Sequence, residues 1–404
     1  MKNLTQHVFG TLVLSLLVVC IALGGGYQLN EQGARAVGMG GAFVARASDP
    51  SAIYFNPAGL TSLSGINVLA GLNLILPSTT FTGSGLILPV ETKTNSQVFT
   101  PINVYGTYQV NDQIVVGLGI FNPFGLGTEW PTQWGKAVPA LGGAYVGSKT
   151  LIKSNVSTWY FNPSIGYKVN EDLSLGLGIS LVLGSATLNN SSMSLDGTAS
   201  GFNANIGAIY KIMPGLSAGL SYRMETDLKF SGNASVPAAG IVSKPGDAKL
   251  EMPGNLQIGV AYDVMPELTV EGDFQYVQWS TYKNLVLDLP APVGTQVQAK
   301  NWDDGFIIRV GGEYKYDPNI TLRAGLIEDI SPQPPSKTEP MLPDGDRTDI
   351  CIGGSYKIDA NFSVDVSYML VLFAKRTVTP AQQILSGEYK STAHVISVNV
   401  GYAF

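Results

Sequence analysis

Residues 167–178 read YKVNEDLSLGLG, and five relatives of this stretch recur along the chain. They begin at Tyr108 (YQVNDQIVVGLG), Tyr210 (YKIMPGLSAGLS), Tyr262 (YDVMPELTVEGD), Tyr314 (YKYDPNITLRAG) and Tyr356 (YKIDANFSVDVS). Each relative has a tyrosine, a short apolar stub, two or three turn residues and then an alternation of apolar residues. This pattern predicts tight turns that join successive antiparallel strands.

The alternation extends well beyond each turn. Apolar residues occupy every second position from Leu173 to Leu183, with small or polar residues between them. The stretch 216–230 alternates in the same way, with charged residues such as Asp227 opposite Leu228 and Phe230. Segments of about ten residues that are apolar outward and polar inward are typical of transmembrane β-barrels. The repeated tyrosines would then lie at the interface between hydrocarbon and headgroups.

The expected fold class is therefore all-β, a transmembrane antiparallel barrel of about fourteen strands, an even number that places both chain ends on the periplasmic side. The long Pro/Gly/Ser-rich connections, such as SGNASVPAAGIVSKPGDAK (231–249), are expected to be extracellular loops. The expected strands are 64–76, 95–110, 112–129, 150–170, 172–188, 198–213, 215–230, 251–264, 267–281, 301–316, 319–330, 347–359, 361–375 and 389–404.

Composition supports an exported envelope protein. The chain has 404 residues, of which 45% are hydrophobic and 13% charged, against about 25% charged in soluble domains. The formal net charge of −6 without a basic block argues against nucleic acid as a partner. Residues 1–24 read as a signal peptide, with Lys2, an apolar run and small residues before Gly25. No later stretch is apolar for long enough to predict a transmembrane helix.

Residues 25–63, which precede the barrel domain at 64–404, are rich in Gly and Ala and lack alternation. Because fourteen strands enclose a lumen too wide for side chains to fill, this segment is expected to fold inside as a hatch. The alternative is that this segment forms a periplasmic tail.

Arg35 and Arg46 of the expected hatch are predicted to pair with carboxylates at inward positions, or else to reach lumenal water. The candidate partners are the acids at inward positions: Glu225, Asp227, Glu271, Asp273, Asp303, Glu313 and Asp365.

Several stretches resemble the FadL/TodX family of outer-membrane channels for hydrophobic compounds. They include GYQLNEQGARAVGMGGAFVA from Gly26, DPSAIYFNPAGL from Asp49, GLGIFNPFGLGTEW from Gly117 and WDDGFIIRVGGEYKYDPNITLRAG from Trp302. The resemblance covers nearly the whole chain after residue 24. It implies a fourteen-stranded barrel with a hatch, capture of a hydrophobic ligand by extracellular loops, and lateral exit through a kinked third strand.

Carried onto this sequence, the hatch motif falls on Asn56, Pro57 and Ala58, and the kink falls on Phe121, Asn122, Pro123, Phe124 and Gly125. Phe121 and Phe124 are expected to line the opening; alternatively, Pro123 marks only a strand end at the outer rim. The loop 189–197 is short for the family. The capture site is therefore expected in the loops around 131–149 and 231–250. The sequence does not identify the ligand, and long-chain fatty acids are the first candidate.

Other functions find less support in the sequence. After the signal peptide the chain keeps one histidine, His394, at a lipid-facing position, and one cysteine, Cys351, at a lumen-facing position. No enzyme activity, metal or cofactor is therefore expected, although a carboxylate site stays conceivable. A general diffusion porin for small polar solutes is the main alternative, and an adhesin or structural barrel is another. The expected location is the outer membrane of a Gram-negative-type bacterium, with outer-membrane lipid around a monomer.

Overall fold

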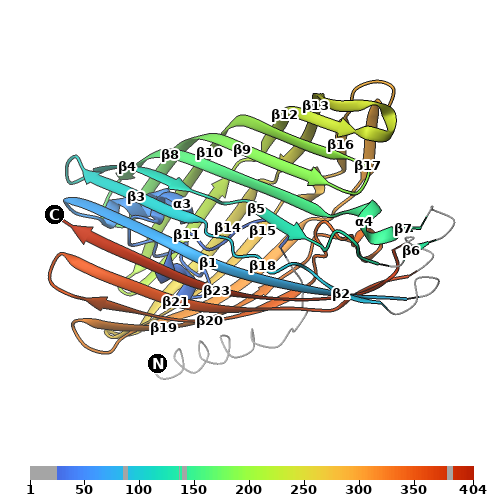
Figure 1. Ribbon diagram of the computed structural model, residues 1–404. Helices are drawn as coiled ribbons and strands as arrows, with labels where there is room; N and C mark the ends of the chain where they lie inside the picture. Colours follow the sequence, from blue (N-terminus) through green and yellow to red (C-terminus); the bar gives the residue numbers. More distant parts are fainter. Residues whose placement is uncertain (1–24, 85–89, 136, 139–142, 380–384) are drawn as a thin grey trace.

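The computed structural model describes residues 25–84, 90–135, 137–138, 143–379 and 385–404, and the proposed signal peptide lies outside them. These residues form an antiparallel sheet that closes on itself, because the first strand pairs with the last along its whole length, from Asn67–Ala403 to Gly83–Gly387 (Figure 1). Closure means that neither the first nor the last strand is an open edge of the sheet, as a bilayer requires. The expected all-β barrel is confirmed.

Over the described residues the barrel wall has fourteen consecutive segments, three of them interrupted. They are β1 (Ile66–Gly83), β3 (Ile102–Gln109), β4 (Ile114–Phe121) with β5 (Gly125–Glu129), β8 (Lys153–Lys168), β9 (Leu173–Asn189), β10 (Ser194–Met213), β11 (Leu216–Arg223) with β12 (Thr226–Val236), β13 (Ile241–Met252) with β14 (Asn255–Met265), β15 (Leu268–Val277), β18 (Gly305–Lys315), β19 (Ile320–Asp329), β20 (Arg347–Lys357), β21 (Phe362–Phe373) and β23 (Gly387–Ala403).

Shorter elements extend the wall or cap one end. They are β2 (Glu91–Lys93), β6 (Ala137–Val138), β7 (Ala144–Tyr145), α4 (Val146–Thr150), η3 (Pro237–Ala239), η4 (Trp279–Thr281), β16 (Asn284–Asp288), β17 (Thr295–Ala299), η5 (Pro335–Lys337) and β22 (Arg376–Val378). Within the described residues, no helix combines the length and apolar character needed to cross a bilayer.

The two faces of the wall follow the period of two in the sequence. On β9, the outward Leu177 and Ile179 are 44% and 55% exposed, whereas the inward Ser180 and Val182 are fully buried. All six repeated tyrosines are 42–53% exposed on the outer face beside the tight turns. The end of the barrel that carries these turns is called the turn end, and the opposite end is called the loop end. The C-terminus lies at the turn end, where the Phe404 N–H donates to the Ile66 carbonyl oxygen.

Residues 25–63 lie inside the ring of strands and form α2 (Ala34–Gly38), α3 (Ala52–Phe55) and η1 (Pro57–Ser62) (Figure 1). Helix α2 contacts β19, β20, β21 and β23, while η1 contacts β4, β8, β9 and β10 on the other side. Ala42, Phe43, Val44, Ile53 and Leu60 are fully buried. This segment is called the hatch below.

Three local expectations need correction. Met224 and Glu225 are both exposed between β11 and β12, so inward and outward positions exchange there, and Leu228 and Phe230 are buried inside. Residues 231–250 are not an irregular loop, because β12 and β13 pair through most of them. The expected strand 95–110 begins only at Ile102.

Candidate functional site

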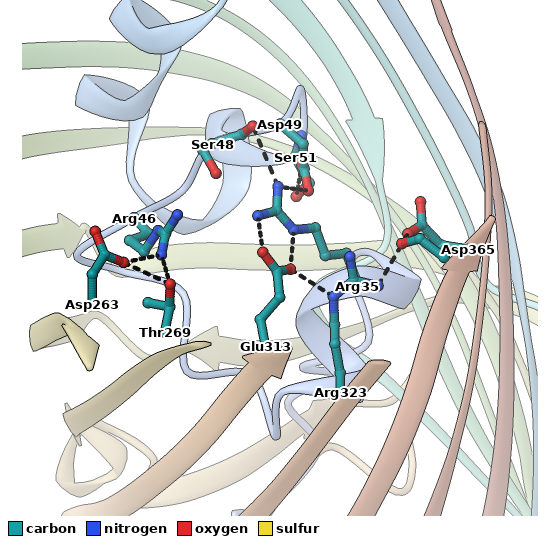
Figure 2. Close-up of polar contacts among 11 residues, drawn as sticks. Arg35, Arg46, Ser48, Asp49, Ser51, Asp263, Thr269, Glu313, Arg323 and Asp365 are labelled. Carbon is teal, nitrogen blue, oxygen red and sulfur yellow. Dashed lines mark hydrogen bonds and ion pairs between the residues drawn. The ribbon is translucent and has the colours of Figure 1, made fainter. Parts of the chain in front are cut away.

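An ion-pair network fixes the first half of the hatch to the barrel wall. Arg35 donates from Nε and Nη2 to both carboxylate oxygens of Glu313, at 2.9 and 3.0 Å (Figure 2). Arg323 donates to the same Glu313 at 2.7 Å and to Asp365 at 3.2 Å. Asp49, within the hatch, lies 3.7 Å from Arg35. The hatch arginine therefore pairs with Glu313 of β18, and Arg323 links Glu313 to Asp365 of β21.

A second arginine fixes the hatch nearer the turn end. The Nη1 group of Arg46 donates to Asp263 at 2.9 Å and also to Thr269 (Figure 2). Arg46 is 26% exposed and Asp263 47%, so solvent screens this pair more than the Arg35 network.

Of the candidate acids, Glu313 pairs with Arg35, whereas Glu225, Asp227, Glu271 and Asp273 form no ion pair with either arginine among the described contacts. Glu271 and Asp273 face the hatch from β15, but they accept hydrogen bonds from the backbone N–H groups of residues 43–45, at 2.6–3.1 Å. The prediction that Glu225 and Asp227 face the lumen is wrong, because the exchange of faces after Arg223 turns both outward. Asp227 is 66% exposed and pairs with Lys249 at 3.4 Å. Asp303 is also exposed.

The Asn56-Pro57-Ala58 motif forms the joint between the hatch and β10. The buried Asn56 donates from Nδ2 to the carbonyl oxygens of Val44 at 2.8 Å and Ala208 at 3.1 Å. Its Oδ1 accepts the Ala58 N–H at 3.1 Å and so caps η1, where Pro57 takes the first position. One amide therefore holds two hatch segments and the wall together.

The wall is interrupted between β4 and β5. Strand β4 pairs with β3 as far as Phe121, and β5 continues beyond the interruption by pairing with β8. The hatch supplies backbone partners at the break: the Leu29 N–H donates to the Pro123 carbonyl at 2.9 Å, and the Gly125 N–H donates to the Tyr27 carbonyl at 3.0 Å. Pro123 therefore lies within the wall and not at a strand end on the outer rim.

Side chains of the break hold its two edges. Asn122 donates to the Thr158 carbonyl at 2.7 Å and accepts the Ile102 N–H at 3.2 Å. Phe124 packs against Tyr27 with ring centroids 6.1 Å apart. Phe121 is buried against Tyr54 of the hatch and does not line the cavity described next, contrary to expectation.

A cavity of about 480 Å³ lies beside this break and is called the wall cavity. Its lining includes Leu29 of the hatch, Phe124 and Gly125 of the break, and the inward Ala393 of β23. It also includes Trp159, which is 37% exposed on the outer face of β8. The wall cavity is therefore lined from both faces of the barrel wall.

A second, narrower cavity of about 60 Å³ lies in the loop-end half of the barrel and is called the apolar pocket. Its lining includes Phe230, Leu250, Leu285 and Trp302, and its charged lining residue, Glu339, is paired with Lys300. Tyr27 of the hatch also lines it.

Only a short stretch of structure separates the two cavities. Val156 and Leu342 line both of them, while Tyr27 lines the apolar pocket and the adjoining Gly26, Gln28 and Leu29 line the wall cavity. The start of the hatch thus lies between an apolar pocket and a break in the wall.

Sequence reasoning missed the apolar pocket and the role of Tyr27. The available signal was the pair of aromatic residues Tyr282 and Trp302 in a polar stretch that alternation does not explain. His394 and Cys351 lie where expected: His394 is exposed on the outer face, where its Nδ1 and the Tyr368 hydroxyl are 2.7 Å apart, and Cys351 is buried.

Comparison with known proteins agrees with this architecture. Residues 15–404 match the family described as outer membrane protein transport protein (OMPP1/FadL/TodX). The long-chain fatty acid transport protein of Salmonella typhi is 26% identical, over 96% of this chain and 98% of that protein. Outer membrane protein P1 of Haemophilus influenzae is 25% identical over 75% of this chain and 74% of its own length.

Solved structures share the fold. A Pseudomonas aeruginosa FadL homologue superposes with a TM-score of 0.84 at 18% identity, covering 94% of this chain and all of that one. The P. putida toluene transporter TodX gives 0.73 at 17% identity, covering 95% and 99%. The chain therefore belongs to the FadL/TodX family of outer-membrane transport proteins for hydrophobic compounds and is not an enzyme.

Proposed function

We propose that this protein takes up long-chain fatty acids by binding part of the hydrocarbon chain in the narrow apolar pocket and releasing the ligand sideways through the break between β4 and β5. The observation that carries the proposal is the arrangement of the two cavities, which meet at Val156, Leu342 and the start of the hatch. Full-length relatives described as long-chain fatty acid transport proteins support this ligand class.

The lining chemistry supports an apolar ligand over a polar one. Burial of apolar surface contributes about 25 cal/mol per Å², and ligand sites are typically concave and mainly apolar. The leucines, Phe230 and Trp302 supply such a surface in the apolar pocket. Ligand entering from the loop end would reach this pocket before the hatch.

Sideways release is supported by the wall itself. No ladder joins β5 to β3 among the described strands, and the Phe99 ring occupies the space beside Gly127, where a Cβ would lie only 1.9 Å from it. An apolar ligand at this level would meet hydrocarbon beyond Trp159 and avoid the aqueous periplasm. The diffusion porin is less well supported, because the hatch fills the lumen that a polar solute would need.

The test is uptake of radiolabelled oleate by cells that carry Ala248→Phe, a change that fills the apolar pocket. We expect uptake to fall at least tenfold while the amount of heat-modifiable barrel stays normal. Ala70→Phe, on the lipid-facing side of β1, adds the same side chain outside the barrel and should leave uptake unchanged. Equal uptake in the two variants would refute the pocket as the ligand site. Labelled toluene, run in parallel, would reveal a monoaromatic transporter instead.

A further inference from the structure

The hatch begins inside the barrel among carboxylates that lack enough cations. Four buried acids surround its first residues: Glu31 of the hatch, Asp329 of β19, Asp344 of the following loop and Asp349 of β20, none more than 7% exposed. The Gly26 N–H donates to the Asp344 Oδ2 at 3.1 Å. A Cβ added to Gly25 would lie 2.3 Å from the Asp329 Oδ2, so the Gly25 main chain lies directly against that carboxylate.

The described cations do not balance this group. Arg347 lies 2.8 Å from the Asp329 Oδ2 and 3.6 Å from the Asp349 Oδ2, and Arg309 is the other buried arginine close by. Arg376 donates to the Asp344 main-chain carbonyl oxygen at 3.0 Å and pairs with Asp346, so three arginines face five acids. Among the described residues, buried oxygens of each acid find no well-aligned hydrogen-bond donor: Glu31 Oε2, both oxygens of Asp329, Asp344 Oδ1, and both oxygens of Asp349. A buried carboxylate without a partner is costly, so such a group is expected to have another cation.

The chain can supply that cation itself. Signal-peptide cleavage is expected after Gly24, where the chain has small residues. Cleavage there would convert the Gly25 amide nitrogen into an α-ammonium group. An α-amino group has an ordinary pKa of about 8, so it is mostly charged at neutral pH. It carries three N–H donors in place of one.

We propose that the α-ammonium of the processed Gly25 is the counter-ion of Asp329 and its neighbours, and that it fixes the start of the hatch between the apolar pocket and the wall cavity. The acid cluster recognises a primary ammonium at the end of a main chain, and Gly25 is suited because a side chain there would collide with Asp329. The proposal does not depend on which ligand is transported.

The test measures the reactivity of this amine in the processed protein, purified folded from outer membranes. Formaldehyde and cyanoborohydride methylate only neutral amines, so the rate against pH reports the protonation of each amine. After labelling between pH 6 and 10, the protein is unfolded, digested with trypsin and analysed by mass spectrometry of the peptide 25–35. Lys375, which is 60% exposed, calibrates the reagent.

We expect this peptide to begin at Gly25, with a half-maximal labelling rate at least one pH unit above the ordinary value of about 8. A buried amine without a carboxylate partner would instead be half-labelled below that value, because burial disfavours the charged form. Asp329→Asn and Asp344→Asn should each raise the rate at pH 8 about tenfold in the folded, heat-modifiable fraction. Asp227→Asn, which removes an exposed acid, should not.

Three results would overturn the proposal. They are a first residue other than Gly25, a half-maximal rate at or below pH 8 in the unsubstituted protein, and rates in both lumenal variants that equal the rate of the Asp227→Asn control. The first two need no variant, so they stand even if a variant fails to fold.

Discussion

At the scale of single residues, Glu313 is the acid shared by hatch and wall. It is 7% exposed and receives both Arg35 and Arg323, while Asp365 and Asp49 balance the outer sides of the two guanidinium groups. Two-point contact between a guanidinium and a carboxylate fixes direction as well as distance. Removing the acid would leave the buried Arg323 and the half-buried Arg35 facing each other, which is more costly than losing a solvent-exposed pair.

Glu313→Gln is therefore expected to loosen the hatch. Breaking a buried ion pair costs about 3–5 kcal/mol, and Cys351 reports the result because it is buried beside Gly40 of the hatch. A water-soluble maleimide should label Cys351 slowly in the folded processed protein and at least tenfold faster in Glu313→Gln. Asp227→Asn, which breaks the exposed pair with Lys249, serves as the control and should label slowly. Equal rates in all three proteins would contradict this role of Glu313.

At the scale of elements, the third wall segment shows how a barrel tolerates a break. Proline has no N–H to donate, and an unpaired backbone group facing hydrocarbon costs several kcal/mol. The break between β4 and β5 turns its backbone inward, where Tyr27 and Leu29 of the hatch replace the missing strand partner. The break and the hatch therefore stabilise each other.

Replacing Pro123 with Val and Gly125 with Thr together should favour continuous pairing of this segment and close the break. The expected result is a steep fall in uptake of labelled oleate, by about tenfold or more, with normal barrel abundance. A matched control is Ile179→Val with Leu181→Thr, two lipid-facing positions of β9 where the pairing with β10 is continuous. If the Pro123/Gly125 variant inserts correctly and takes up oleate at the unsubstituted rate, the sideways route is wrong.

At the scale of the whole molecule, the hatch fits because inward positions of the wall are kept free of side chains. A Cβ at Gly311 would lie 2.1 Å from the Met39 carbonyl oxygen, and one at Gly219 would lie 2.2 Å from that of Val44. The hatch backbone can thus approach the strands directly, and Glu271 and Asp273 accept its N–H groups there.

Deleting residues 27–60 should open the lumen. In planar bilayers the intact protein is expected to conduct little, while the deletion variant should show stable channels of much higher conductance. Glu313→Gln, which keeps every hatch residue, provides an intermediate comparison. A deletion variant that folds as a heat-modifiable barrel but conducts no more than the intact protein would show that the hatch is not the plug.

The barrel could be predicted from the sequence because its determinants are local. A period of two and six tyrosine-flanked turns depend only on neighbours along the chain. They were enough to predict the strand order, the outward His394 and the inward Cys351. The break at Pro123 was equally visible, since a proline interrupts alternation wherever it falls.

The contacts between hatch and wall were decided only by the tertiary structure. Two consecutive exposed residues, Met224 and Glu225, exchange the faces of β12, so that Asp227 leaves the lumen and Phe230 enters it. Alternation cannot reveal such a shift, because the pattern on either side of it stays regular. Arg35 likewise pairs with Glu313, 278 residues away in the sequence. This pairing depends on how the sheet closes and on where the hatch lies inside it, and neither is a local property of the sequence.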